Sequence, residues 1–510
     1  MNSRTQKSAK NMTVGMLSQL FTLLLSFVSR TIFIKYLTAE YLGISGLFSN
    51  VLTVLSFAEL GIGDAMTYAM YKPVKEDNRK LVNQLMVVYK KAYTGIAVVV
   101  GTIGLFLSFF LNFIIAEPPN IPESLQLIFW LYVINNMASY LLTYKKSVLI
   151  AYQENYIISG VQQLSSVIQQ VAQMIVLCFT RQYILYLIIQ ILCTILNNII
   201  ISIIVKKRYP WINERESEDL PQEVSKEIFK NVKALSVSKI AGVVSNGSDN
   251  IIISKFVGLS SVGVASNYTM IINSLNGILW NGLSSLTSSF GNFNVDSTIG
   301  QRRKLFNELF LCSYWLYGFM TIGIITLANS FIQLWVGSDY LVPQGVVLAL
   351  ILITYISGVN FPAYTYQSTL GMFDKMKLPY VLFALFNILL SILLGKSWGL
   401  FGVYIATSIS RLCTSEVSSG YYVYRYGLKL TPLNYLKKYV ISFVILILNA
   451  LVTNYVVSLV RIEGVIGFVI KTIICTVVCN SIYFICFFRT VEFQNLLMRA
   501  KGLLSSRRRI

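Results

Sequence analysis

The chain alternates between long apolar runs and short polar segments along nearly its whole length. The apolar runs are about 20 residues or longer, which at 1.5 Å per residue lets a helix cross a hydrocarbon core of roughly 30 Å. They are rich in Leu, Ile, Phe and Gly, and they lack the short alternating segments of a membrane β-barrel. The pattern therefore predicts an all-α polytopic membrane protein.

The first apolar run begins near Met12, after three basic residues. It is longer than the apolar region of a signal peptide and has no small-residue cleavage site near its end, so we expect a retained helix. Further spans are predicted near 43–66, 87–115, 125–151, 156–179, 183–205, 233–256, 262–289, 308–332, 344–370, 376–394, 398–420, 438–460 and 464–488. The total is about fourteen helices.

An internal repeat relates the two halves of the chain. SRTIFIKYLTAEYLGISGLF from Ser29 returns as DNIIISKFVGLSSVGVASNY from Asp249, at a constant offset of about 220 positions. RKLVNQL from Arg79 returns as RKLFNEL from Arg303, with an offset larger by roughly four residues, as an insertion would produce. The order of apolar and basic segments is the same in both copies, which indicates a tandem duplication in one orientation.

The repeat and the hydrophilic stretches define the expected domains. Residues 206–232 form the longest polar stretch and separate an N-terminal six-helix lobe, 1–205, from a C-terminal six-helix lobe, 233–420. Residues 421–510 have no counterpart in the first half, and we expect an additional helix pair followed by a basic tail. The two lobes should be related by a parallel repeat.

Composition and charge agree with this topology. Hydrophobic residues make up 55% of the chain and charged residues 13%, and the mean hydropathy is +0.63. Most of the 42 Lys and Arg residues fall in segments that are cytoplasmic if the N-terminus is inside, as the positive-inside rule requires. The net charge of +20 is then mainly an orientation signal that also favours anionic inner-leaflet lipid, and no motif indicates nucleic-acid binding.

Several chemistries are excluded or disfavoured by missing residues. The chain has no His, which removes a His general base, a His-ligated zinc site and a Ser-His-Asp triad. It has no GxxxxGK[ST] and no GxGxxG, which argues against direct use of ATP or a dinucleotide. The seven Cys lie in apolar spans and are expected to be free thiols. We therefore expect no cofactor, no metal and no catalytic residues.

Basic residues inside the spans are the first candidates for substrate binding, because hydrocarbon makes charges costly. Arg30 lies near the outer end of an otherwise uncharged run, and the repeat aligns it with Asn250. A cation there could hold a phosphate of an anionic substrate, or it could extend to the interface or pair with a carboxylate. Lys239 and Arg411 are further candidates, although both, like Glu416, could reach water at the inner ends of their spans.

Polar residues suggest a second, ion-binding function. Asp249 lies deep in its span. Together with Asn387 and Ser391, which are one helical turn apart, and Thr407 on the next helix, it could complete an all-oxygen cation site.

Two polar stripes have helical spacing. Gln162, Gln169 and Gln173 share one face of the fifth predicted helix, and Thr269, Asn273, Asn276 and Trp280 share one face of the eighth. Amides beside an aromatic ring suit a hydroxylated ligand such as a sugar. The alternative role is hydrogen bonding between helices. We favour this alternative slightly for the Gln stripe and equally with ligand binding for the stripe on the eighth helix.

These residues also carry a resemblance to a known family. LTAEYLG from Leu37, FAELG from Phe57, DNIIIS from Asp249, and VGV from Val262 through Tyr268 resemble the polysaccharide-export flippases, the Wzx-type branch of the superfamily that holds the MATE exporters. The likeness covers nearly the whole chain, although no single motif is diagnostic. The added helix pair departs from a strict twelve-helix plan, and in related lipid-linked precursor flippases such a pair contributes to a groove for the lipid tail.

The resemblance implies a function. Two six-helix lobes would enclose a cavity and move an undecaprenyl-pyrophosphate-linked oligosaccharide from the inner to the outer leaflet by alternating access, for capsule, O-antigen or exopolysaccharide assembly. Arg30, and less directly Lys239 and Arg411, would face the pyrophosphate. The protein would be a multi-pass protein of the bacterial cytoplasmic membrane with both termini inside, would work as a monomer, and would have membrane lipids and polysaccharide polymerase or chain-length proteins as partners.

Other classes of protein remain possible on the sequence. An ion-coupled, MATE-like small-molecule antiporter would share the architecture, although a cationic drug would favour carboxylates where Arg30 stands. A membrane glycan polymerase would more naturally carry catalytic groups on a large outer loop, and the predicted outer loops are short. A passive scaffold would not explain the charges inside the spans.

Overall fold

The structure is a computed structural model of the whole chain. It describes residues 21–56, 59, 61–115, 118–212, 220–296, 298–370 and 372–507, and it gives only the backbone for residues 64, 227, 231, 233–246, 285–296, 373 and 500–507. The described chain is helical and contains no strand, as the apolar pattern predicts. The predicted start of the first helix near Met12 lies outside the described residues.

The chain forms two compact units, residues 1–263 and 264–510. The domain bounds expected from the sequence, with the polar stretch 206–232 between two lobes, stay a prediction, and a helix that begins within this stretch packs in the first unit. This helix, α10 (Gln222–Phe256), contacts α2 and α3. The first unit therefore includes the beginning of the second sequence repeat.

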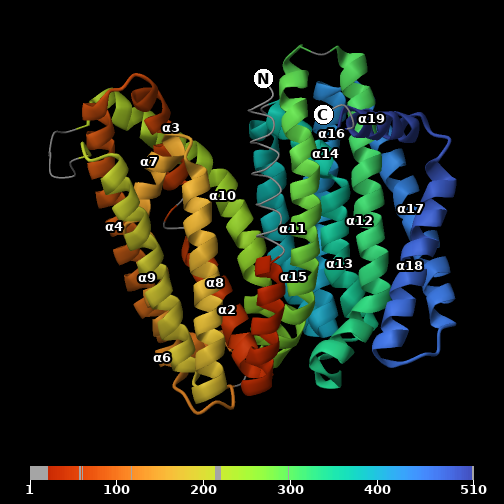
Figure 1. Cartoon of the computed structure of the whole chain (residues 1–510), viewed down its shortest axis with the longest axis horizontal. Coiled ribbons are helices and arrows are strands. Elements are labelled where there is room, and N and C mark those ends of the chain that lie inside the picture. The colour runs from red at the N-terminus through yellow and green to blue at the C-terminus, as the bar shows by residue number, and fades with distance from the viewer. Residues whose placement is uncertain are drawn as a thin grey trace. The chain divides into compact units, whose positions relative to one another are not determined.

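Unit 1 is a bundle of helices that run lengthwise through it (Figure 1). Helix α6 packs against α4 and α9, and α8 packs against α9. Besides the helical residues 21–36 and the α10 helix, its elements are α2 (Ala39–Leu55), α3 (Ile62–Lys75), α4 (Arg79–Ser108), α5 (Leu111–Ile114), α6 (Leu125–Tyr140), η2 (Thr143–Lys145), α7 (Lys146–Ala151), α8 (Asn155–Thr180), α9 (Tyr183–Arg208) and the first turn of α11 (Leu259–Asp296).

The span predicted near 43–66 is broken. Helix α2 ends at Leu55, and α3 begins after Gly61, which has a φ of 77°. Glycine reaches this left-handed conformation at little steric cost. The Gly-Ile-Gly sequence from Gly61 therefore marks a break within the predicted second span.

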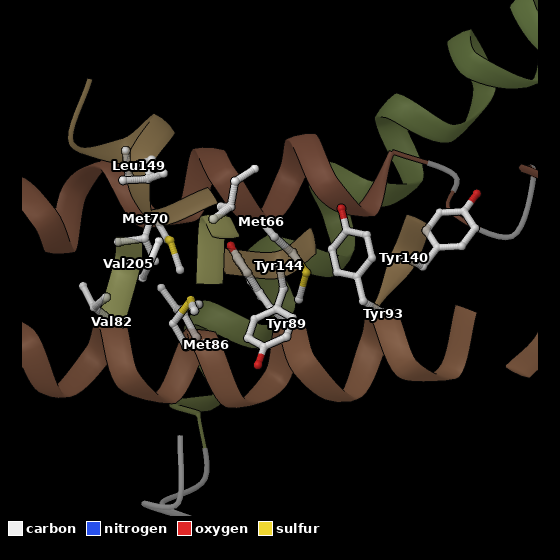
Figure 2. Close-up of a cluster of buried hydrophobic side chains, with 14 of the residues drawn as sticks. Met66, Met70, Val82, Met86, Tyr89, Tyr93, Tyr140, Tyr144, Leu149 and Val205 are labelled. Carbon is white, nitrogen blue, oxygen red and sulfur yellow. The ribbon is translucent and has the colours of Figure 1, made fainter. Parts of the chain in front are cut away.

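The core of unit 1 includes part of the linker between the repeats. Figure 2 shows Met66 and Met70 of α3 close to Met86 and Tyr89 of α4, with further buried side chains from α6 to α9 around them. Ile228 of α10 belongs to the same cluster, and Trp211 packs against it. The Asn83 amide also donates to the Trp211 carbonyl oxygen at 3.4 Å. Both sides of the linker are therefore anchored on unit 1.

Polar contacts hold the start of the linker. Arg208 pairs with Glu154 at 2.9 Å, and the Tyr209 hydroxyl donates to the same carboxylate at 3.0 Å. The Tyr209 ring stacks on Tyr152 with centroids 4.5 Å apart. Burial, together with the hydrogen bond to Glu154, raises the pKa of Tyr209, so its hydroxyl remains a neutral donor at physiological pH.

The two copies of the repeat meet at a close helix crossing within unit 1. A Cβ atom added to Gly43 would overlap the carbonyl oxygen of Leu259, and one added to Gly263 would overlap the carbonyl oxygen of Ala39. The repeat offset pairs Gly43 with Gly263 and Ala39 with Leu259, so the contact is reciprocal. Small residues allow such backbone approach between membrane helices.

Unit 2 contains the remaining helices. Helix α12 is central, since it packs against α13, α17, α18 and α19. The elements are the rest of α11, then α12 (Ile299–Val336), η3 (Ser338–Tyr340), α13 (Gln344–Val359), α14 (Phe361–Thr369), α15 (Phe373–Arg411), η4 (Leu412–Glu416), α16 (Val417–Tyr422), η5 (Val423–Gly427), α17 (Pro432–Ser458), α18 (Gly464–Phe487) and α19 (Val491–Arg507).

Three features of unit 2 bear on the predicted spans. The backbone of α15 turns at Gly399, where φ is 57° and ψ is −136°, which separates the spans predicted at 376–394 and 398–420. Helices α13 and α14 bend by 43° at Asn360 within the span predicted at 344–370. Helices α17 and α18 pack together as the predicted additional pair, and α19 crosses the end of the bundle (Figure 1).

The chain spans a membrane several times. In the described part of the chain, eight helical segments are long and apolar enough to cross, or nine if α13 and α14 form one bent span. One of these segments, 374–427, contains the turn at Gly399 and so holds two predicted spans. The total of about fourteen stays a prediction.

Candidate functional site

Unit 1 contains a cationic site built around Arg30. This residue is half-buried and lies six positions before Tyr36, where its helix ends, a distance of about 9 Å along the axis. Its charge acts on the hydroxyls of Tyr132 of α6 and Tyr186 of α9. The guanidinium therefore interacts electrostatically with phenol groups of unit 1.

The tyrosines around Arg30 form a connected cluster. The hydroxyls of Tyr132 and Tyr183 lie 3.0 Å apart, and both side chains are buried. Tyr183 stacks with Tyr186 at a centroid distance of 5.8 Å, and Phe33 meets both rings edge-on at 5.9 and 5.4 Å. Phenol hydroxyls can donate to an anion, so Arg30 and these tyrosines provide one charge and several donors in one place.

One carboxylate lies at the edge of this cluster. The ring of Tyr41 meets Tyr183 at 4.8 Å, and its hydroxyl donates to Glu123. Glu123 directly precedes the cap of α6, and Tyr183 begins α9. These positions place the Arg30 cluster toward the end of unit 1 that the charge pattern predicts to be extracytoplasmic.

Glutamines on and beside the predicted Gln stripe of α8 make contacts between helices. Gln163 donates to Thr22, and Gln170 accepts from Ser26 at 3.1 Å, both on the helix that carries Arg30. Gln173 is buried and donates to the Tyr186 carbonyl oxygen at 3.1 Å. Of the predicted stripe, only Gln173 has an interhelical bond here, because Gln169 donates to Gln173 at 3.5 Å on the same helix and Gln162 is exposed. The structure supports the interhelical interpretation for Gln173 and for the neighbouring Gln163 and Gln170.

The candidates on α11 have different environments. Asn276 accepts a hydrogen bond from the Tyr317 hydroxyl at 2.8 Å, while Asn273 is exposed. Trp280 meets Phe361 edge-on at 4.8 Å and Tyr364 at 5.7 Å. Asn276 thus serves a contact between helices, and Trp280 packs on α14.

Arg411 lies at the end of α15 in unit 2. Its guanidinium donates to the Ser357 hydroxyl at 2.6 Å and lies 5.2 Å from the centre of the Phe383 ring. Lys239 is on α10, and its side chain lies outside the described residues. The basic candidates therefore divide between the two units, with Arg30 in unit 1 and Arg411 in unit 2.

Three of the four ion-site candidates come together. Asn387, Ser391 and Thr407 are all buried, and the Asn387 amide nitrogen donates to Thr407 at 2.7 Å and to Ser391 at 3.4 Å. The fourth, Asp249, is half-buried on α10 in the other unit. Among the described side chains, no three His, Cys, Asp or Glu residues group as metal ligands. Cation binding by the four residues stays a prediction.

Sequence reasoning missed several residues of these sites. The tyrosines of the Arg30 cluster were not singled out, although Tyr183 and Tyr186 have the three-residue spacing of one helix face. Asn360 and Tyr435 of unit 2 were also missed. Asn360 donates to Glu416, and Tyr435 donates to Asn360. These contacts join three separate elements, so no local spacing could reveal them.

The bundles of apolar helices with polar clusters inside them define a class, the α-helical polytopic membrane proteins. Within this class the chain belongs to the polysaccharide biosynthesis protein family, whose model matches residues 8–286, more than half of its 510 residues. A search of curated protein sequences found no match.

Solved structures show how widely the fold is shared. A lipid II flippase, MurJ, in an inward closed conformation is 16% identical, with a TM-score of 0.68 over 93% of this chain and 99% of that one. An inward-facing MATE family multidrug resistance transporter of the MOP superfamily is 13% identical, with a TM-score of 0.62 over 80% and 95%. At such identities the likeness concerns the fold, which agrees with the resemblance found in the sequence motifs.

Proposed function

We propose that the protein is a flippase that moves an undecaprenyl-pyrophosphate-linked oligosaccharide from the inner to the outer leaflet of the bacterial cytoplasmic membrane. The observation that carries the proposal is the placement of Arg30 beside buried and half-buried tyrosines inside a helical unit. Membership of the polysaccharide biosynthesis family supports a glycan precursor as cargo. The fold shared with a lipid II flippase supports transfer of a lipid-linked molecule.

The chemistry of the Arg30 site suits a pyrophosphate. A guanidinium binds phosphate oxygens in pairs through its fixed fork of N–H donors, and the phenols of the cluster add neutral donors. Bringing a phosphate out of water is costly unless it is paired and hydrogen-bonded. Arg30 would offset that cost, while the polyprenyl tail would stay in the surrounding lipid.

The site argues against a cationic cargo. A MATE-like antiporter for cationic drugs would need carboxylates or aromatic faces free of a fixed positive charge, and Arg30 places such a charge inside unit 1. An anionic or neutral small molecule is the remaining alternative. No ATP-binding motif is present in the sequence, so we propose that transfer is coupled to an ion gradient, the membrane potential or consumption of the product. We further propose that both termini are cytoplasmic and that the protein is not an enzyme.

The test is transfer of a fluorescent undecaprenyl-pyrophosphate oligosaccharide in proteoliposomes. Dithionite added outside quenches only label in the outer leaflet, so flippase activity increases the fraction quenched above that in empty vesicles. Arg30→Ala removes a charge-assisted contact of about 1.5–3 kcal/mol. It should therefore raise the substrate concentration at half-maximal transfer roughly 10- to 100-fold. Arg30→Lys keeps the charge without the fork and should give an intermediate loss.

Arg181→Ala is the matched control. Arg181 follows α8 in the same unit, is exposed, and contacts the ring face of Tyr36, so its loss should leave transfer unchanged. If the folded protein moves no lipid-linked glycan under an imposed proton or sodium gradient, the flippase proposal is wrong. If transfer occurs and Arg30→Ala transfers the glycan as well as the wild type does, the proposed cargo is supported and the proposed binding of phosphate by Arg30 is wrong.

A further inference from the structure

A chain of hydrogen bonds in unit 2 joins three parts of the bundle. Glu416, the last residue of η4, accepts a bond from the Asn360 amide nitrogen. The side-chain amide oxygen of Asn360 in turn accepts from the Tyr435 hydroxyl of α17. Asn360 and Tyr435 are buried and Glu416 is half-buried. One carboxylate therefore connects the region of η4 to the junction of α13 and α14 and to the additional helix pair.

Both backbone segments at this carboxylate depart from regular α-helix. Residues Leu412–Glu416 form a π-helix, and π-helical turns inside α-helices occur frequently at functional sites. Asn360 is the residue between α13 and α14, whose axes bend by 43°, and Pro362 directly follows the start of α14. A proline near a helix start removes a backbone donor at the bend. Glu416 thus holds the side chain of the hinge residue.

The charged surroundings of Glu416 come from two helices. Arg411 of α15 interacts with it electrostatically while donating to Ser357 of α13. Among the described side chains, Tyr380 of α15 and Tyr435 and Tyr439 of α17 also interact with it. Ionised Glu416 balances the charge of Arg411, and protonated Glu416 leaves that charge uncompensated.

We propose that Glu416 is a proton-binding site of unit 2 and that its protonation changes the bend between α13 and α14. A proton from water would bind a carboxylate oxygen and raise the net charge of the Glu416 and Arg411 pair from zero to plus one. Bonds to an ionised carboxylate are roughly twice as strong as neutral ones, so protonation weakens the hold on Asn360. The inference goes beyond the proposed function, since it concerns this unit whatever molecule is carried.

Trp280 provides a reporter inside the same unit. Its ring packs edge-on against Phe361, the first residue of α14, and beside Tyr364. A variant that keeps Trp280 and has the other tryptophans replaced by Phe would show a change of bend as a change in emission. The spectrum is recorded in detergent without cargo from about pH 4 to about pH 9, a range that covers ordinary and buried carboxylates.

We expect one sigmoidal transition of Trp280 emission that E416Q abolishes. Glutamine keeps the size of the side chain and an oxygen that accepts from Asn360, but it cannot bind the proton. E463Q, at an acid between α17 and α18, is the matched control and should keep the transition. E416D, which keeps an acid at a shorter reach, should shift the midpoint.

Folding of each variant is checked by size exclusion and helical circular dichroism. The proposal is overturned if the folded parent shows no transition over the range, or if E416Q keeps it. Should E416Q fail to fold, E416D decides: a shifted midpoint supports the proposal, and an unchanged midpoint contradicts it.

Discussion

Replacing Gly43 by Ala should destabilise unit 1 by forcing apart the crossing of the two repeat copies. The added Cβ would overlap the Leu259 carbonyl oxygen, which is backbone and cannot rotate away. The reciprocal change, Gly263→Ala, would overlap the Ala39 carbonyl oxygen and approach the Gly43 nitrogen to 2.9 Å. Overpacking a close contact costs typically about 1–3 kcal/mol, and clashes with backbone lie at the upper end.

The expected effect can be stated as a melting temperature. A destabilisation of about 3 kcal/mol lowers the midpoint by about 6 °C at the roughly 2 °C per kcal/mol of a large domain. The two substitutions together should lower it by less than the sum, because the first already opens the crossing that the second would clash with. The assay is thermal unfolding in detergent. The measured quantity is the fraction of protein that stays monodisperse on size exclusion after heating.

Gly160→Ala in α8 is the matched control, since a Cβ there meets nothing within 4 Å. Alanine is favoured over glycine inside a helix by about 0.5–1 kcal/mol, so this variant should be as stable as the parent or slightly more stable. If Gly43→Ala and Gly160→Ala unfold at the same temperature, the close crossing does not exist and the structural basis of the repeat is wrong.

Three further substitutions test other contacts. Asn198→Ala should lower the melting temperature of unit 1, because the Asn198 amide donates to the Ala138 and Leu141 carbonyl oxygens at 3.0 and 2.8 Å. The expected loss of stability is about 2 kcal/mol. Asn197→Ala, which removes the acceptor of a 3.4 Å bond from Ser165, should have a smaller effect. Trp211→Ala should release the linker, because about 1–2 kcal/mol of side-chain burial is lost, and should speed tryptic cleavage after Arg208 about tenfold. Equal cleavage in Trp211→Ala and in the exposed-site control Trp398→Ala would contradict this. Asn449→Ala should expose Cys479 to maleimide, because Asn449 donates to the Cys479 carbonyl at 3.1 Å; a Cys479 that stays unreactive while exposed Cys486 labels would show that the α17–α18 contact does not depend on Asn449.

The hydrophobic pattern predicts where most helices lie because hydrocarbon requires each crossing to be apolar and fully hydrogen-bonded. It fails where a helix is interrupted by conformation. The break after Leu55 depends on the left-handed Gly61, and the bend at Asn360 depends on a proline two positions later. Both residues are visible in the sequence, but a glycine or proline inside an apolar run is also common in unbroken membrane helices. The helical start of α10 was hidden by its polarity, because its apolar residues, Val224 and Ile228, are few and pack on a core made by other segments.

The candidate site residues also divide into those that local sequence spacing predicts and those that it does not. Asn387 and Ser391 are one turn apart on a helix, and the structure joins them with Thr407 from the next segment, because local spacing and a short connection suffice. The surroundings of Arg30 could not be predicted in this way. Its tyrosines come from α6 and α9, which are about 100 and about 150 positions further along the chain. Sequence identified the costly charge, and only the packing of the unit identifies the groups that surround it.

The duplication explains why the two copies can differ in chemistry while keeping one contact alike. At the crossing, both copies need a glycine for the same backbone approach, so Gly43 and Gly263 agree. One helical turn or more away from the crossing, the helices no longer require a glycine. The residue aligned with Arg30 is Asn250, whose amide nitrogen lies 3.6 Å from where a Cβ of Gly46 would stand, an ordinary van der Waals separation. The cation of unit 1 therefore has no aligned equivalent in the second copy, and unit 2 carries its charged pair, Arg411 and Glu416, on a different helix.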